Sequence, residues 1–177
     1  FKCDVSFIGT YSPKKERILT ALVKSVPGID LKVWGYQWEK ATSEKLKPYI
    51  QYEAVIGDLY CIAIQSSKIN LGLLSEVVSG ASMGDLITSR TFHIPGAGGF
   101  LIHERNEESI LYYEEDKEAV FFSDIQDLID KISYYLSHED ERKDIMEKGH
   151  ERALKDHSIT ERASRVANKV NELFYEN

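Results

Sequence analysis

The polar residues most able to bind a ligand lie close together, and they are Asp85, Thr88, Arg90, Thr91 and His93. A proline and several glycines follow at residues 95–99, and an apolar run at residues 100–102 is typical of a buried strand. If the polar segment leads into a helix, its residues meet one end of a parallel sheet. That edge is where open α/β sheets bind ligands.

Each part of this segment has two interpretations. Arg90 precedes an apolar helix, so its guanidinium either faces solvent or binds a phosphate through two hydrogen bonds. His93 lies between Phe92 and Ile94, which is also the pattern of a core histidine whose hydrogen bonds are satisfied. The glycines at residues 96–99 permit close helix–strand packing or a close approach of the backbone to a ligand, or they form a helix C-cap and turn.

A second candidate is the Gly9–Thr10 turn after the apolar run at residues 5–8. In a doubly wound sheet this turn opens a helix, whose N–H groups and dipole can hold a phosphate. Positive charge follows at Lys14, Lys15 and Arg17. The full Gly-x-Gly-x-x-Gly fingerprint is missing, so an ordinary loop with a solvated basic face is the alternative.

Composition limits the classes of partner. A chain of 177 residues fits one domain, and its net charge of −7 argues against nucleic acid or an anionic membrane surface. Cys3 and Cys61 each lie in an apolar run, which predicts reduced core residues, and no histidine has metal-like spacing. No apolar run reaches the ~18–20 residues of a membrane span. Without a signal peptide, we expect a cytoplasmic protein.

Strands and helices alternate before a helical tail. The expected strands are residues 5–8, 31–34, 52–56, 69–73, 100–102 and 119–122. The expected helices are one opening at Ser12 and Pro13, then residues 58–66, 89–95, 107–113, 125–136, 139–155 and 160–175. This order predicts an α/β fold, a Rossmann-like doubly wound parallel sheet with a helical C-terminal tail.

Smaller features complete the expected organisation. We expect Asp58 to cap its helix, and residues 74–84 to form a loop holding Gly80 and Gly84. His150 and His157 are expected on the surface of helices. The chain begins with Phe1 close to a strand, so we expect residues 1–177 to be a single domain cut from a longer protein.

Residues 88–101 carry a resemblance to a known family. They resemble the Arg-x-Phe-Glu-Ile-Pro-Ala-x-Gly-Gly core of the group 1 glycosyltransferases, in the branch similar to spore maturation protein CgeB. Further segments resemble the same family in the same order, namely residues 5–10, 66–71, 118–122 with 127–128, 136–142, and His157 with Arg162. The resemblance therefore covers nearly the whole chain.

The resemblance implies one half of a GT-B fold, the C-terminal domain that binds a nucleotide-sugar donor such as a UDP-sugar. The missing N-terminal domain would bind the acceptor, which is a glycan, a protein or a small molecule. No cofactor and no metal is implied, because a helix dipole and basic side chains would neutralise the pyrophosphate. The implied donor-binding residues are Gly9, Thr10, Arg17, Lys68, Arg90, Thr91, Gly98 and Gly99.

The implied catalytic pair departs from the family pattern. Related enzymes place two acidic residues eight positions apart against the sugar and the ribose, and the matching residues here are Asp85 and His93. A neutral imidazole accepts one hydrogen bond where a carboxylate accepts two or more. The alternatives are a non-catalytic structural or interaction domain, as in spore coat or envelope assembly, and a flavodoxin-like or receiver-like module.

Overall fold

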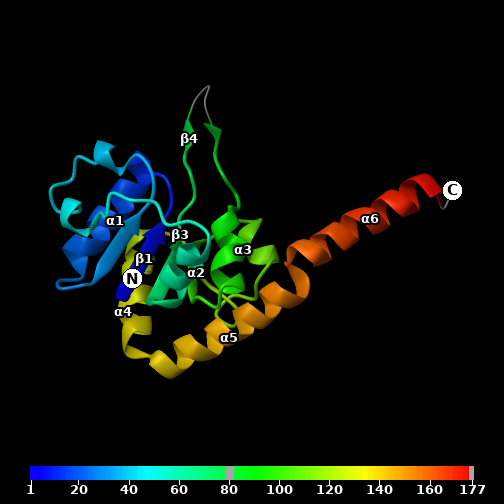
Figure 1. Cartoon of the computed structure of the whole chain (residues 1–177). Coiled ribbons are helices and arrows are strands. Elements are labelled where there is room, and N and C mark those ends of the chain that lie inside the picture. Colours follow the sequence, from blue (N-terminus) through cyan, green and yellow to red (C-terminus); the bar gives the residue numbers. More distant parts are fainter. Residues whose placement is uncertain (79–81, 176–177) are drawn as a thin grey trace.

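The computed structural model describes residues 1–78 and 82–175, and a five-stranded parallel sheet forms its centre (Figure 1). The strand order is β2-β1-β3-β6-β7. The bounds are Cys3–Ile8 for β1, Leu31–Trp34 for β2, Ser67–Gly72 for β3, Leu101–Glu104 for β6 and Val120–Phe122 for β7. The chain turns to opposite sides of the sheet from β1 and from β3, so the switch point lies between these two strands.

Helices cover both faces of the sheet. Helices α1 (Pro13–Ser25) and α4 (Ile125–Ser137) bury apolar side chains against one face. Helices α2 (Asp58–Gln65), α3 (Ser89–Gly96) and α5 (Glu139–Asp156) pack on the other. The predicted Rossmann-like doubly wound fold is therefore confirmed.

The last helix, α6 (Ile159–Tyr175), projects away from the domain (Figure 1). Its apolar residues are exposed, among them Val166, Val170 and Leu173. Their spacing of three to four positions places them along one side of the helix. Within the described residues, no helix is both long and apolar enough to cross a membrane.

Two expectations between β2 and α2 are wrong. Residues 52–56 form no strand, because Tyr52 has a left-handed φ of 54° and only Ile50 makes an isolated bridge, to Val33. Asp58 does not cap α2. The capping position belongs to Gly57, which makes no side-chain bond and has a φ of 57°.

Further differences lie on the surface. Part of the expected loop at residues 74–84 is an antiparallel pair, β4 (Val77–Val78) with β5 (Ser82–Met83), and Gly80 lies outside the described residues. The expected helix at residues 107–113 is a 3-10 turn over Ser109–Leu111. Cys3 is buried as predicted, whereas Cys61 is exposed because α2 turns that side outward.

His150 and His157 are half-buried, and each donates a hydrogen bond to a backbone carbonyl of another segment. His150 Nδ1 donates to the Pro95 carbonyl at 2.8 Å, and His157 Nε2 donates to the Tyr112 carbonyl at 2.9 Å. The expectation that both are surface residues is therefore wrong. The partial burial of His157 also comes from its ring contacts, because it lies against the rings of Phe92 and Tyr113.

Candidate functional site

A pocket of about 360 Å³ opens at the carboxyl edge of the sheet beside the switch point. The segments lining it come from the ends of β1 and β2, the loop before α2, and the first turns of α2 and α3. Its lining residues include Gly9, Thr10, Tyr36, Tyr60, Arg90 and His93. Rings and apolar atoms dominate the walls, and a guanidinium lies at one side.

Arg90 spans the switch point. Its Nη2 donates to the Leu73 carbonyl at 2.9 Å after β3, and its Nη1 approaches the Ile8 carbonyl of β1 at 3.5 Å. Its Nε is buried without a hydrogen-bond partner among residues 1–78 and 82–175. A Cβ at Gly9 would come within 2.8 Å of Nη1, so the guanidinium fits because position 9 is glycine.

Lys15 brings a second cation to the same place from α1. Its side chain is 3% exposed, and its Nζ donates to the Thr10 carbonyl at 3.1 Å and to Ser75 Oγ at 3.4 Å. The Phe7 ring lies beside both cations, with its centroid 5.9 Å from Lys15 Nζ and 5.4 Å from Arg90 Cζ. These contacts are all to neutral groups.

Neither cation forms an ion pair with a carboxylate in the described part of the chain. Burial, with repulsion from Arg90, lowers the pKa of Lys15 to about 8. Burial also lowers the pKa of Arg90, although a guanidinium keeps its charge at neutral pH. One buried and one half-buried positive charge, both held by neutral oxygens, form a site suited to an anion.

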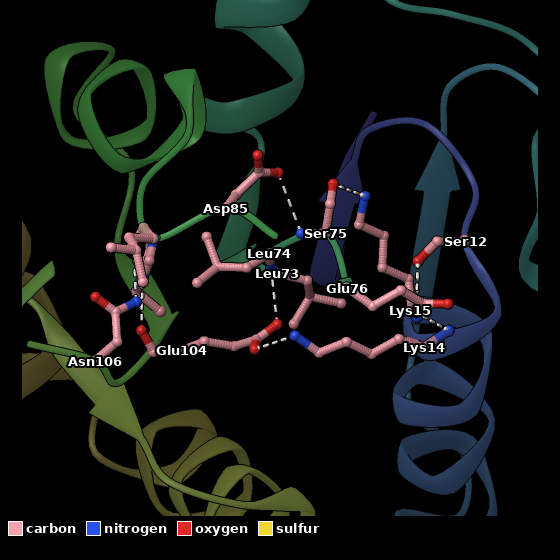
Figure 2. A network of polar contacts seen from close by, with 12 residues as sticks. Ser12, Lys14, Lys15, Leu73, Leu74, Ser75, Glu76, Asp85, Glu104 and Asn106 are labelled. Carbon is pink, nitrogen blue, oxygen red and sulfur yellow. Dashed lines mark hydrogen bonds and ion pairs between the residues drawn. The ribbon is translucent and has the colours of Figure 1, made fainter. Parts of the chain in front are cut away.

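A neighbouring network of polar contacts joins the start of α1 to the ends of β3 and β6 (Figure 2). Glu104, at the end of β6, pairs with Lys14 Nζ at 2.5 Å and accepts the Leu74 N–H at 2.7 Å. Glu76 accepts the backbone N–H of Lys14 at 2.8 Å, and Ser12 Oγ accepts that of Lys15 at 3.4 Å. The backbone N–H groups in the first turn of α1 are therefore already bonded to side chains of the protein.

The first turn of α3 is bonded at Thr88 and Thr91 but not at the two residues between them. Ser89 and Arg90 line the pocket, and no acceptor among the described residues contacts their backbone N–H groups. Unpaired N–H groups and the helix dipole make such a turn favourable for a phosphate or carboxylate. The arrangement therefore places Arg90 and the start of α3 at the pocket, and Lys15 next to it through its bond to the carbonyl of the pocket residue Thr10.

The family described as glycosyl transferase-like matches residues 14–168. The chain belongs to this family. No curated protein sequence matches it.

Solved structures share the fold of this glycosyl transferase-like chain. Anabaena Alr3699/HepE, solved with UDP-glucose, matches 97% of the chain at 11% identity and a TM-score of 0.75. A glycosyltransferase from Rickettsia africae matches 100% at 14% identity and a TM-score of 0.75. The chain spans 49% of each of these two proteins. The C-terminal domain of LpcC, a group 1 glycosyl transferase from Francisella tularensis, matches 89% at 15% identity and a TM-score of 0.62, and 87% of that domain is covered.

The predicted catalytic pair is not brought to one wall of the pocket. His93 lines the pocket and is exposed, so its interpretation as a core histidine is wrong. Its ring lies edge-on to Tyr60 with centroids 5.9 Å apart. Asp85 is half-buried on the segment before α3, where its Oδ2 accepts the Ser75 N–H at 3.3 Å (Figure 2).

Two predicted cations lie away from the pocket. Arg17 is exposed on α1 and lines a different groove with Tyr11 and Thr42. Lys68 is the second residue of β3, at the amino edge of the sheet, and its Nζ pairs with Asp4 at 2.7 Å. The parallel strands separate this edge from the pocket, so the structure does not bring Lys68 to the site.

Four other predicted residues divide between the two edges. Gly9 and Thr10 line the pocket, although the Gly9 N–H is already bonded to the Trp34 carbonyl at 2.9 Å. Gly98 and Gly99 follow the C-terminal end of α3, away from Arg90. A Cβ at Gly99 would meet Ile64 Cγ2 at 2.4 Å, so this glycine permits close helix–strand packing. Gly99 therefore has the packing role, whereas Gly98, with a φ of 75° directly after the C-cap residue Ala97, has the C-cap and turn role.

Thr91 points into the protein interior. It is 0% exposed, and its Oγ1 lies 2.9 Å from His103 Nε2. A side chain buried in this way is not at a ligand surface, whatever its place in the sequence motif. Thr91 therefore supports α3 from behind rather than lining the pocket.

The run of basic residues alone does not distinguish Lys15 from Lys14 and Arg17. The signal was present, because Lys15 precedes the buried residues Ile18, Leu19 and Leu22 by three, four and seven positions. That spacing puts it on the buried side of α1. A lysine on an apolar stripe that opens next to a βα turn is the pattern that would have indicated it.

Proposed function

We propose that this chain is the donor-binding domain of a two-domain GT-B glycosyltransferase that transfers a hexosyl group from a UDP-sugar. The observation that carries the proposal is a pair of cations without a carboxylate partner in the described residues, the buried Lys15 and the half-buried Arg90, beside the first turn of α3. A nucleoside diphosphate supplies the negative charge that these groups lack. The solved neighbours with UDP-glucose or UDP support this ligand class.

The proposed chemistry follows from where charge develops. Cleavage of the bond between the sugar and the diphosphate leaves additional negative charge on the leaving phosphate. Lys15, Arg90 and the α3 amides would stabilise that charge, and Lys15 most strongly because it is shielded from water. These groups do what a divalent cation would otherwise do, so we propose that donor binding needs no metal.

The remaining pocket residues would orient the donor. Tyr36, Tyr60 and His93 present rings along one pocket. We propose that Gly9 and Thr10 approach the donor phosphates and that neutral His93 accepts one hydrogen bond from the donor's hydroxyls. Asp85 would accept hydrogen bonds from the sugar, in addition to its bond from Ser75.

Two finer assignments are also proposals. The motif at residues 88–101 supports the CgeB-like branch of the family. A partner half that binds the acceptor is supported by the solved neighbours, which are about twice the length of this chain, and by the uncovered apolar side of α6. A purely structural domain is less favoured, because it would have no use for two neighbouring cations held only by neutral groups.

Titration calorimetry of the chain with UDP tests the proposal, with uridine as the matched ligand that lacks phosphates. We expect UDP to bind and to raise the midpoint of thermal unfolding, and uridine to have a much smaller effect. Amide signals of Ser89 and Arg90 should shift. Absence of any response at millimolar UDP would reject the proposed donor site.

A further inference from the structure

His103 makes a hydrogen-bonded connection from the end of β6 to the start of α3. Its side chain is 0% exposed, with Nδ1 2.7 Å from the Glu104 carbonyl and Nε2 2.9 Å from Thr91 Oγ1. Thr91 Oγ1 in turn accepts the backbone N–H of Thr88 at 3.1 Å. None of the three side chains lines the pocket.

The partners fix the direction of every bond in this connection. A carbonyl only accepts, so Nδ1 of His103 carries the proton and donates to Glu104. The neutral ring then offers Nε2 as an acceptor, and the hydroxyl of Thr91 donates to it. The remaining lone pairs of Thr91 accept the Thr88 N–H, which is an otherwise free group at the helix start.

The surrounding residues hold the ring in this orientation. A Cβ at position 72 would come within 2.4 Å of His103 Cδ2, so Gly72 leaves just enough space for the imidazole. The Phe121 ring lies on another side, with centroids 6.1 Å apart. Burial lowers the pKa of His103 to about 4, which agrees with a neutral ring.

We propose that His103 and Thr91 are positioning residues that set the first turn of α3 and thereby aim Arg90 across the switch point. The proposal rests on the proposed function of that site. Thr91 directly follows Arg90, and Thr88 and Thr91 flank the two residues of this turn that line the pocket, Ser89 and Arg90. A shift of this turn would move the guanidinium away from the Leu73 and Ile8 carbonyls.

Both ring nitrogens of His103 and the Thr91 hydroxyl are bonded, whereas Thr88 Oγ1 is buried without a hydrogen-bond partner in the described residues. An apolar pair of similar volume would fill the same space without specifying where the helix begins. The hydrogen bonds specify it, because the Thr88 N–H reaches Thr91 Oγ1 at one rotation and depth of α3. The position of the donor site thus depends on a residue two strands away from β1.

The test compares Thr91→Val with Thr91→Ser. Valine keeps the shape and removes the hydroxyl, whereas serine keeps the hydroxyl. We expect valine to weaken UDP binding about tenfold and serine to stay within about threefold of the wild type. Thr20→Val on α1 is the matched control, because Thr20 Oγ1 is buried without a hydrogen-bond partner in the described residues. It should leave UDP affinity unchanged.

Equal UDP affinity in Thr91→Val and the wild type would overturn the proposal. Nuclear magnetic resonance of the isotope-labelled imidazole gives a readout that does not depend on UDP. We expect His103 to be protonated on Nδ1 alone at neutral pH, and the Ser89 and Arg90 amide signals to move in Thr91→Val but not in Thr20→Val. Protonation on Nε2, or unmoved amides, rejects the positioning role even if UDP binds. Failure of the wild type to bind UDP, with these signals as expected, rejects only the donor site.

Discussion

The first turns of α1 and α3 lie at the same edge of the sheet, but they differ in whether their backbone N–H groups are bonded to side chains. Glu76 and Ser12 bond to the N–H groups that open α1. In the described residues, no side chain bonds to the N–H groups of Ser89 and Arg90 that open α3. An N–H group that already has a carboxylate partner has little affinity to gain from a phosphate.

The difference teaches that a βα turn is not a phosphate site by position alone. Helix α1 would contribute to the proposed donor site through one buried side chain, Lys15, rather than through its backbone N–H groups. Helix α3 would contribute to the same site through both the backbone N–H groups of Ser89 and Arg90 and the Arg90 side chain. The glycine turn after β1 serves mainly to let Arg90 approach, since a Cβ at Gly9 would contact its guanidinium.

Removing the guanidinium of α3 should have the largest effect. We expect Arg90→Ala to weaken UDP binding by about 1–3 kcal/mol, the usual cost of a lost charged hydrogen bond. Titration calorimetry measures the loss, and Arg17→Ala is the control because Arg17 is exposed on α1. If the two variants bind UDP equally well, the contrast between α1 and α3 is wrong.

Removing the buried amine of α1 should have two effects of opposite sign. We expect Lys15→Met to weaken UDP binding by about 1 kcal/mol and to raise the free energy of unfolding of the ligand-free chain by about 1 kcal/mol, because a buried unpaired charge is lost. Lys14→Met is the neighbouring control. It leaves Glu104 without its ion-pair partner, so it should lower that free energy. A lower free energy of unfolding in Lys15→Met would contradict the inferred cost of burying the Lys15 charge.

The pKa of Lys15 adds a pH dependence. It is about 8 in the folded chain against an ordinary 10.5, so the unfolded chain binds more protons between these values. The free energy of unfolding of the ligand-free chain should therefore rise with pH across this window. Below pH 8 the full cost of burying the charged Lys15 amine applies. Affinity for a UDP-sugar should fall above pH 8, as the ammonium is lost. Fluorescence titrations of wild type and Lys15→Met check this, and identical pH profiles would exclude Lys15 as the cause.

The fold could be predicted because its signals are local. Apolar runs and helical stripes identified β1, β2, α1 and α4 closely. The failed strand at residues 52–56 shows the limit, since the left-handed Tyr52 leaves no trace in residue type. Backbone conformation at a single non-glycine residue depends on surroundings that come from distant segments.

The site could be predicted only in part, for a related reason. Arg90 and His93 were found because residue types and motif coincide at the start of α3. Thr91 was misplaced because a hydroxyl beside a ligand and a hydroxyl in a buried chain look alike in sequence. The partner that decides between them, His103, is on β6 and meets Thr91 only after the sheet has formed.

The smallest effect is expected at the opposite edge of the sheet. Lys68 is half-exposed and pairs with Asp4 at the amino ends of β1 and β3, so Lys68→Ala should leave UDP affinity unchanged. An exposed ion pair of this kind contributes about 0–1 kcal/mol to folding, and chemical denaturation should detect no more. A loss of UDP affinity approaching that of Arg90→Ala would mean that the donor extends beyond the carboxyl edge. The switch point between β1 and β3 could then no longer be the centre of the site, because no single ligand pose would contact both edges through the packed strands.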